Sequence, residues 1–221
     1  MPSSDRRAAR RQEILAATRR LFDERGVRDA QIEDIAQAVG INRAIIYRHF
    51  SGKEELFAMA LVSYLDELDE RLAAACESIE DPVERLDALT YAFLDFGEGY
   101  PAFVDCAQAL LRRRGDELMK EVSEPVMYRL GRAMTACTSH LVKVLEEGTK
   151  DGVFDVKDPD LVANIFYTQA LGVLNLATLQ LSVRALIPGR PRADRVLFED
   201  VKGYVAEAAR AIARGPAPAK R

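Results

Sequence analysis

The segment IEDIAQAVGINRAIIYRHF, residues 32–50, is the part of the sequence that most constrains the fold. Its apolar residues recur at three- and four-residue spacing, which predicts one helix at about residues 32–39 and a second at about 43–49. Gly40 lies between them and permits a tight turn, and Asn42 is a good N-cap residue for the second helix. Two short helices joined by a glycine-containing turn form the helix-turn-helix pattern.

The other segments also show helical periodicity and predict an all-α protein with about nine helices. A first helix at about 7–25 completes an N-terminal three-helix head, and a larger C-terminal helical bundle follows. The last two helices are expected at about 159–184 and 194–213, with the loop IPGRPRAD between them. We therefore expect a helix-turn-helix DNA-binding domain over residues 1–52 and an effector-binding and dimerisation domain over residues 53–221.

Charge is distributed unevenly along the chain. Residues 1–53 carry eleven Lys and Arg against seven Asp and Glu, whereas the whole chain has a net charge of −4. A basic segment attached to an acidic remainder is expected where one end of a protein binds a polyanion.

Composition also bounds the location and the class of protein. No apolar run reaches the roughly 18–20 residues of a membrane span, and the basic start lacks the apolar core of a secretory signal. Three widely spaced cysteines, Cys76, Cys106 and Cys137, indicate reduced thiols in a cytosol. A soluble cytoplasmic protein that contacts no membrane is predicted. Because glycine-rich phosphate loops and nucleophile elbows are absent from the sequence, we expect neither an enzyme nor a cofactor.

Two stretches, ILAATRRLFDERG and IEDIAQAVGINRAIIYRHFSGKEELF, resemble the DNA-binding domain of the TetR family of transcriptional regulators. The resemblance covers about the first 60 residues and rests most on YRHF followed by KEELF. It implies a homodimeric transcriptional regulator, a repressor, that binds a (pseudo)palindromic operator in double-stranded DNA. The resemblance further implies release from the operator by a small-molecule effector.

The third helix carries most of the predicted DNA contacts, because this helix of the motif enters the major groove with its N-terminal residues on base edges. Arg43 suits guanine, and Asn42 suits adenine or a phosphate. By resemblance to the family, Tyr47, His49 and Lys53 contact phosphates. The full predicted set is Asn42, Arg43, Ala44, Ile45, Tyr47, Arg48, His49 and Lys53.

Other interpretations exist for parts of this region. Ile46 and Phe50 are expected to face the core of the head, and Tyr47 is as consistent with a core aromatic as with a phosphate contact. His49 is equally consistent with a structural role. The N-terminal arginines at positions 6, 7, 10 and 11 fit a solvated tail as well as contacts to DNA.

The sequence departs from the family pattern at two places. The family usually has glycine and threonine where this chain has Ala44 and Ile45, so Ile45 is expected to contact a thymine methyl instead of a phosphate. The family also commonly opens the second helix with threonine or serine. Here Ala30 lacks a hydroxyl, and Asp29 or Gln31 is expected to cap that helix.

The family resemblance places an effector pocket in the C-terminal bundle. Polar residues inside apolar stripes are the better indicators of such a pocket, because buried polar groups need partners. Aromatic residues of the bundle are weaker indicators, since they are more often core. The predicted pocket residues are Tyr64, Phe96, Phe103, Gln108, Tyr128, His140, Gln169 and Asn175. A small, mostly apolar effector is expected, because no basic pair stands within the apolar stripes.

The helix expected at 159–184 is apolar on more than one face, which indicates burial in a core or at an interface. The resemblance implies that the last two helices pair with their counterparts about a twofold axis. The predicted dimer-interface residues are Phe166, Ala170, Val173, Leu174, Ala177, Val201, Tyr204, Val205 and Ala208. Burial within one chain is the alternative.

Two alternatives to an effector-released repressor remain. One is a DNA-binding protein without a small-molecule effector. The other is a metal- or redox-responsive regulator that uses Cys106, Cys137 and His140, because Cys137 and His140 share a helix face and zinc binds such ligands. With two histidines and no close cysteine pair in the chain, we expect no metal.

Overall fold

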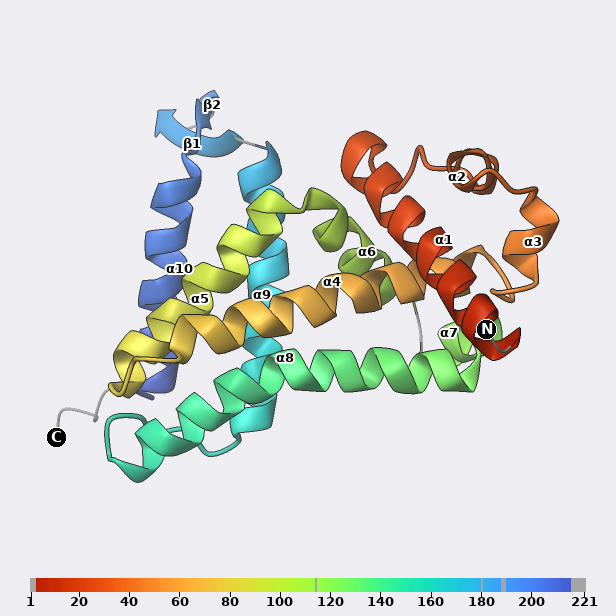
Figure 1. The fold of residues 1–221 in the computed structure, drawn as a ribbon. Coiled ribbons are helices and arrows are strands. Elements are labelled where there is room, and N and C mark those ends of the chain that lie inside the picture. Colours follow the sequence, from red (N-terminus) through yellow and green to blue (C-terminus); the bar gives the residue numbers. More distant parts are fainter. Residues whose placement is uncertain (1–2, 114, 180, 188–189, 216–221) are drawn as a thin grey trace, which may run out of the picture. The chain divides into compact units, whose positions relative to one another are not determined.

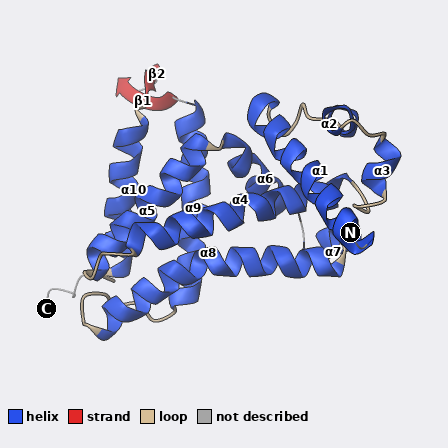
Figure 2. Cartoon of the chain, viewed as in Figure 1, coloured by secondary structure: helices blue, strands red, loops and turns tan. Residues whose placement is uncertain are grey.

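The computed structural model of the 221-residue chain describes residues 3–113, 115–179, 181–187 and 190–215. The described residues form ten helices and one two-stranded sheet (Figures 1 and 2). The elements are α1 (Ser3–Arg25), α2 (Ile32–Val39), α3 (Arg43–Tyr47), α4 (Lys53–Cys76), α5 (Pro82–Gly99), α6 (Pro101–Leu111), α7 (Gly115–Glu121), α8 (Glu124–Lys150), α9 (Pro159–Leu179), β1 (Leu181–Ile187), β2 (Arg190–Arg195) and α10 (Phe198–Ala213).

The chain divides into two compact units. Unit 1 comprises Met1–Glu67 and Tyr100–Met134, and unit 2 comprises Leu68–Gly99 and Thr135–Arg221. The boundaries between the units fall inside α4 and α8, so each of these helices contributes residues to both units. The functional division at residue 52 that the sequence suggests remains a prediction.

The helix-turn-helix forms where the sequence predicts it. The backbone N–H of Gln31 donates to Asp34 Oδ2 at 3.2 Å, so Gln31, one of the two candidates, precedes α2 as its N-cap. Gly40 ends α2 with φ +71°, a left-handed conformation that glycine adopts without steric cost. Asn42 then caps α3, because its Oδ1 accepts a hydrogen bond from the N–H of Ile45 at 3.2 Å.

Helix α3 is shorter than predicted. It ends at Tyr47 instead of about residue 49. The following residues continue as a turn, in which the N–H of His49 donates to the carbonyl of Ile46 at 2.9 Å. Ile46 and Phe50 are each 1% exposed, which confirms that both face the core of unit 1.

The core of unit 2 is built from α5, α9 and α10, which lie side by side (Figure 1). Gly97 of α5 permits a close helix approach, since a Cβ there would lie 2.3 Å from Leu174 Cδ1. Ion pairs add to this packing: Lys202 Nζ lies 2.8 Å from Asp95 Oδ1, and a second pair joins α10 to α5 further along. These contacts hold α10 on α5.

The helix predicted at about 159–184 forms but ends earlier, and the loop predicted after it is wrong. Helix α9 ends at Leu179, and β1 pairs antiparallel with β2, with Val183 opposite Ala193 (Figure 2). The physical reason is visible in LSVRALI, where apolar residues alternate at a period of two, which suits a strand. This hairpin aside, the described elements are helices, and the all-α fold class is confirmed.

Among the described residues, no helix combines the length and hydropathy that crossing a bilayer requires.

The tenth helix is the short α7, which the expected count of about nine did not include.

Candidate nucleic-acid interface and effector cavity

The outer face of α3 is open to solvent. Asn42, Arg43, Ala44 and Arg48 are exposed, and Tyr47 is 50% exposed. The interpretation of Tyr47 as a core aromatic is therefore wrong. This face presents side chains of the types that contact bases and phosphates.

Asn42 uses part of its hydrogen-bonding capacity inside the protein. Its Oδ1 caps α3 by accepting from Ile45, which leaves the Nδ2 amide as a free donor among the described contacts. An asparagine that reads adenine uses both its oxygen and its nitrogen. Both predicted roles of Asn42, toward adenine and toward a phosphate, stay predictions.

Arg43 stands at the first position of α3 and is paired with α2. Its Nη1 lies 3.0 Å from Oε1 of Glu33, and the two side chains are 69% and 63% exposed. The hydrogen bond from Arg43 lowers the pKa of Glu33. Sequence reasoning missed Glu33, although its place in the first turn of α2 was an available signal.

The N-terminal arginines lie on helix α1 and not in a loose tail. Arg11 contacts the turn that follows α3. Its Nη1 donates to the backbone oxygen of His49 at 2.9 Å, and its guanidinium lies 4.5 Å from the ring centroid of Phe50. Arg10 pairs with Glu13 at 2.7 Å on the same helix. Arg11 therefore holds the end of the helix-turn-helix against α1.

His49 lies within a positively charged part of unit 1. Its pKa is lowered, first by burial and then by the charges of Arg7, Arg11, Arg10 and Arg48. The direction of this shift favours the neutral imidazole at pH 7. The surrounding arginines supply the positive potential that attracts a polyanion.

Lys53 begins α4, where the positive end of the helix dipole lies. Its Nζ lies 5.0 Å from the ring centroid of Phe57. Because a helix N-terminus favours anionic groups, Lys53 is well placed to bind a phosphate.

Glu55 is a buried carboxylate that sequence reasoning missed. It is 5% exposed and accepts a hydrogen bond from Ser51 Oγ at 2.6 Å. Burial alone would raise the pKa of Glu55, but hydrogen bonds from Ser51 and Ser123 and the charge of Arg11 outweigh it, so the pKa is lowered. Glu55 therefore joins the turn before α4 to the turn before α8. The four-residue spacing from Ser51 was the available signal.

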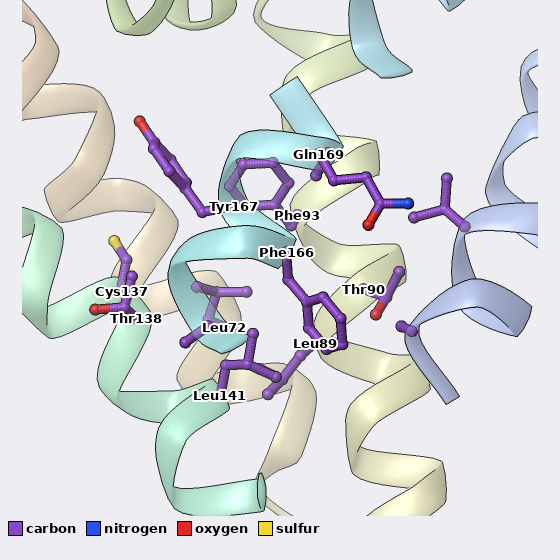
Figure 3. Close-up of a pocket in the computed structure, with 14 residues that line it drawn as sticks. Leu72, Leu89, Thr90, Phe93, Cys137, Thr138, Leu141, Phe166, Tyr167 and Gln169 are labelled. Atoms are coloured by element: carbon purple, nitrogen blue, oxygen red, sulfur yellow. The ribbon is translucent and has the colours of Figure 1, made fainter. Parts of the chain in front are cut away.

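A largely apolar cavity of about 70 Å³ lies within unit 2 (Figure 3). Residues of α4, α5, α8, α9 and α10 line it, and Figure 3 shows the ring of Phe166 beside Leu89. Burial raises the pKa of the Tyr167 hydroxyl, and Cys137 adds to the shift, so this phenol stays protonated. The lining residues are Leu72, Leu89, Thr90, Phe93, Cys137, Thr138, Leu141, Ala163, Phe166, Tyr167, Gln169, Ala170, Val205 and Ala209.

Comparison with known proteins decides the family. The sequence model described as "Bacterial regulatory proteins, tetR family" matches residues 14–60. The HTH-type transcriptional repressor KstR2 of Mycobacterium tuberculosis is 31% identical over 183 residues, which cover 83% of this chain and 84% of the repressor. The chain belongs to the TetR family. It is accordingly a DNA-binding transcriptional regulator, as the sequence predicted.

Solved structures agree with this assignment. The ketosteroid transcriptional regulator KstR2 of M. tuberculosis superimposes with a TM-score of 0.58 at 27% identity, over 91% of this chain and 93% of that one. FadR from Bacillus subtilis in complex with stearoyl-CoA has a TM-score of 0.65 at 16% identity, over 90% and 96% of the two chains. The second likeness supports the fold alone.

One of the eight predicted pocket residues, Gln169, lines the unit 2 cavity of this TetR-family regulator. Tyr64, Phe96 and Phe103 are fully buried core residues, and Tyr128 is 68% exposed. The sequence pattern identified these aromatics as apolar but did not distinguish a core position from a cavity wall.

The remaining predicted pocket residues are polar. His140 Nε2 lies 2.7 Å from Asp69 Oδ1, so its partner is a carboxylate of α4. Gln108 lies on α6 in unit 1, and Asn175 lies half-buried on α9. Neither is among the residues that line the unit 2 cavity.

The predicted dimer-interface residues divide into two groups. Leu174, Ala170 and Val201 are at most 8% exposed within unit 2, and Phe166 and Val205 line the cavity. Of the others, Tyr204 is 74% exposed, Val173 and Ala208 are half-buried, and the side chain of Ala177 lies outside the described residues.

A partly different set of apolar side chains, which shares Tyr204 with the predicted set, is exposed on α9, on α10 and at Leu197 just before α10. Val173, Leu176 and Tyr204 line a groove formed by these two helices. The exposed set is Leu161, Ile165, Leu176, Leu197, Tyr204 and Ile212.

The alternative metal site is not assembled in the part of the chain that the structure describes. No group of three or more His, Cys, Asp or Glu side chains there is arranged to hold an ion. Cys106 belongs to unit 1, whereas Cys137 and His140 belong to unit 2.

Proposed function

We propose that this TetR-family regulator is a homodimeric repressor that binds a twofold-symmetric operator and is released by a small, mostly apolar effector. The observation that carries this proposal lies on one helix. Helix α4 has Lys53, a proposed phosphate contact, as its first residue, and Leu72 of the same helix lines the unit 2 cavity. The helix is therefore the covalent route by which a ligand in unit 2 affects DNA binding. Residues 1–52 serve DNA binding, and residues 53–221 serve effector binding and dimerisation.

The DNA contacts follow from the exposed face of α3. Arg43 reads a guanine, Ile45 with Ala44 contacts a thymine methyl, and Asn42 donates to a phosphate. Further phosphate contacts come from Tyr47, Arg48, His49 and Lys53. The exposure of Arg43, Ala44 and Tyr47 on α3 and the positive charge around His49 support this assignment.

The unit 2 cavity must enlarge when the effector binds. Ligand pockets usually measure about 300–1,000 Å³, whereas this cavity measures about 70 Å³. An effector therefore binds a minor, more open state and shifts the population toward it. The effector carries few polar groups, and these contact Thr90, Thr138 and Gln169. The ketosteroid named for one relative is largely apolar.

The second copy of the chain covers the exposed apolar face of α9 and α10. This face includes Ile165, Leu176 and Tyr204, and its burial against a symmetric copy removes it from water. A twofold dimer also presents two α3 helices to two half-sites.

An in vitro selection tests the DNA half of the proposal. The purified protein is expected to enrich a twofold-symmetric sequence from a random double-stranded pool. Enrichment of no sequence, or of sites without symmetry, contradicts the proposal.

A thermal-shift screen of apolar compounds tests the effector half. A true effector at about 100 times its Kd stabilises by about 2.7 kcal/mol, which raises Tm by roughly 5–10 °C for a chain of this size. Gln169→Trp, which narrows the cavity, is expected to abolish the shift, whereas Asn164→Trp, an exposed position on the same helix, keeps it. If no compound stabilises the protein and operator binding is normal, the regulator works without an effector.

A further inference from the structure

A second cavity lies within unit 1 and shares no lining residue with the unit 2 cavity. Its volume is about 310 Å³, compared with about 70 Å³ for the unit 2 cavity. Residues of the α1–α2 connection, the first turn of α4, α6 and α7 line it. The volume lies within the range of small-molecule sites, so this cavity admits a ligand without enlargement.

The floor of the unit 1 cavity is apolar. Val27, Cys106 and Leu118 are 7%, 4% and 9% exposed, and the ring of Phe57 also faces the cavity. Burial raises the pKa of the Cys106 thiol to about 12, and nearby Asp105 and Asp23 contribute, so this sulfur is uncharged at pH 7. The floor therefore favours a hydrocarbon chain over a charged group.

The rim of the cavity is cationic. Arg113 is already neutralised, because it lies 4.0 Å from Glu54 and also pairs with Glu121. Arg28 and Lys53 differ, since neither forms an ion pair with any residue that the structure describes. Two cationic side chains that form no ion pair with a described residue thus stand beside an apolar floor.

We infer that the unit 1 cavity binds an amphipathic anion, a carboxylate on an apolar chain. The chain lies on Phe57, Cys106 and Leu118, and the carboxylate pairs with Arg28 and Lys53. A charge-assisted hydrogen bond to each cation fixes the anionic end, and the apolar floor selects against short anions. This site is separate from the unit 2 cavity and differs from it in requiring a charge.

Such a ligand competes with the operator. This consequence rests on the proposed function, in which Lys53 binds a DNA phosphate. A carboxylate paired with Lys53 occupies the same amine and adds a negative charge where a phosphate would lie. The ligand therefore lowers operator affinity directly in unit 1, without acting through the unit 2 cavity.

Calorimetric titration of the full-length protein with octanoate tests the site. Saturable binding is expected for octanoate. Acetate, which lacks the chain, and 1-octanol, which lacks the charge, are expected to bind at least about tenfold more weakly. Absence of saturable octanoate binding, or equal binding of octanol, overturns the inference.

Three variants locate the binding. Ala109→Phe fills the cavity from an exposed position of α6, and Arg28→Gln removes one rim charge. Each is expected to weaken octanoate binding at least about tenfold, whereas Arg112→Gln, a neighbouring exposed arginine that does not line the cavity, leaves it unchanged. If Ala109→Phe lowers Tm strongly, its weaker binding reflects a folding defect, and the binding measured for Arg28→Gln then decides whether octanoate occupies the unit 1 cavity. Unchanged binding in Arg28→Gln, with loss in Gln169→Trp, places octanoate in unit 2 and overturns the inference.

A competition measurement tests the link to DNA. With octanoate at ten times its Kd, the apparent Kd for the operator is expected to rise about elevenfold in the wild type and not in Ala109→Phe. Octanoate binding that leaves operator affinity unchanged overturns the competition. If the ligand-free protein binds no operator, the proposed function fails, while the calorimetric result still decides whether the site exists.

Discussion

Arg43 and Glu33 form an ion pair between the two helices of the helix-turn-helix, with 3.0 Å from Nη1 to Oε1. The pair occupies one nitrogen of the guanidinium and leaves its other donors available. A carboxylate in this position orients Arg43 and at the same time places a negative charge near DNA. Glu33 is therefore expected to increase the preference of the protein for operator DNA over unrelated DNA.

Replacement of Glu33 by Gln tests this role. Loss of the negative charge is expected to increase affinity for unrelated DNA, and loss of the orienting contact is expected to decrease the ratio of operator to unrelated binding. Fluorescence anisotropy with an operator and a scrambled duplex measures both constants. An unchanged ratio contradicts the orienting role. Glu24→Gln, an exposed carboxylate of α1, is the matched control.

Arg43→Ala is expected to relax specificity at one base of each half-site. A two-point contact to guanine contributes about 1–3 kcal/mol of discrimination, and the variant loses it. Binding to a set of operators with single-base changes measures the loss. If all positions weaken equally, Arg43 contacts phosphate and not a base.

Lys53→Ala is expected to behave differently from Arg43→Ala. A lost phosphate contact weakens all sequences about equally and reduces the slope of log K against log salt by about one. Titrations at several salt concentrations provide this slope. A base-specific loss with an unchanged slope contradicts the phosphate role of Lys53.

Glu55→Gln is expected to destabilise unit 1 at neutral pH by about 1–3 kcal/mol, because a hydrogen-bonded buried carboxylate loses its charge. The pKa of Glu55 is lowered in the folded state, so its stabilisation is present above its ordinary value of 4.5 and is lost as pH falls through the folded-state pKa. The difference between wild type and variant in urea unfolding should therefore shrink below about pH 4.5. A difference that persists there shows that packing, and not charge, is responsible.

Gly97→Ala is expected to cost about 1–3 kcal/mol of stability, since its Cβ would lie 2.3 Å from Leu174 Cδ1 in a packed core. Gly131→Ala is the matched control on α8, where no atom lies within 4 Å, and it is expected to stabilise by about 0.5–1 kcal/mol. Thermal or urea unfolding measures both. Equal effects of the two substitutions would mean that α5 and α9 are not closely packed at Gly97.

Local signals allowed much of unit 1 to be predicted from the sequence. Asn42 and Gly40 marked the ends of two helices, and their roles depend on neighbouring backbone atoms only. The hairpin β1–β2 was missed because a helical pattern in α9 runs directly into an alternating one at Leu181.

The cavities were harder to predict. Phe166 and Tyr64 are both aromatic residues in apolar helices, yet one lines a cavity and the other is fully buried beside Asp23. The difference depends on which helices meet, and this information is distributed over distant parts of the sequence. The same limit applies to Leu174, which an apolar stripe assigned to the dimer interface and which packs against Gly97.

Footprinting of the purified protein on the DNA upstream of its own gene tests the central claim most directly. The account predicts a protected, twofold-symmetric site whose half-sites are separated by about one helical turn or a multiple of it, and weaker protection of that site by Arg43→Ala. Protection without symmetry, or no protected site there or elsewhere in the genome, contradicts the account.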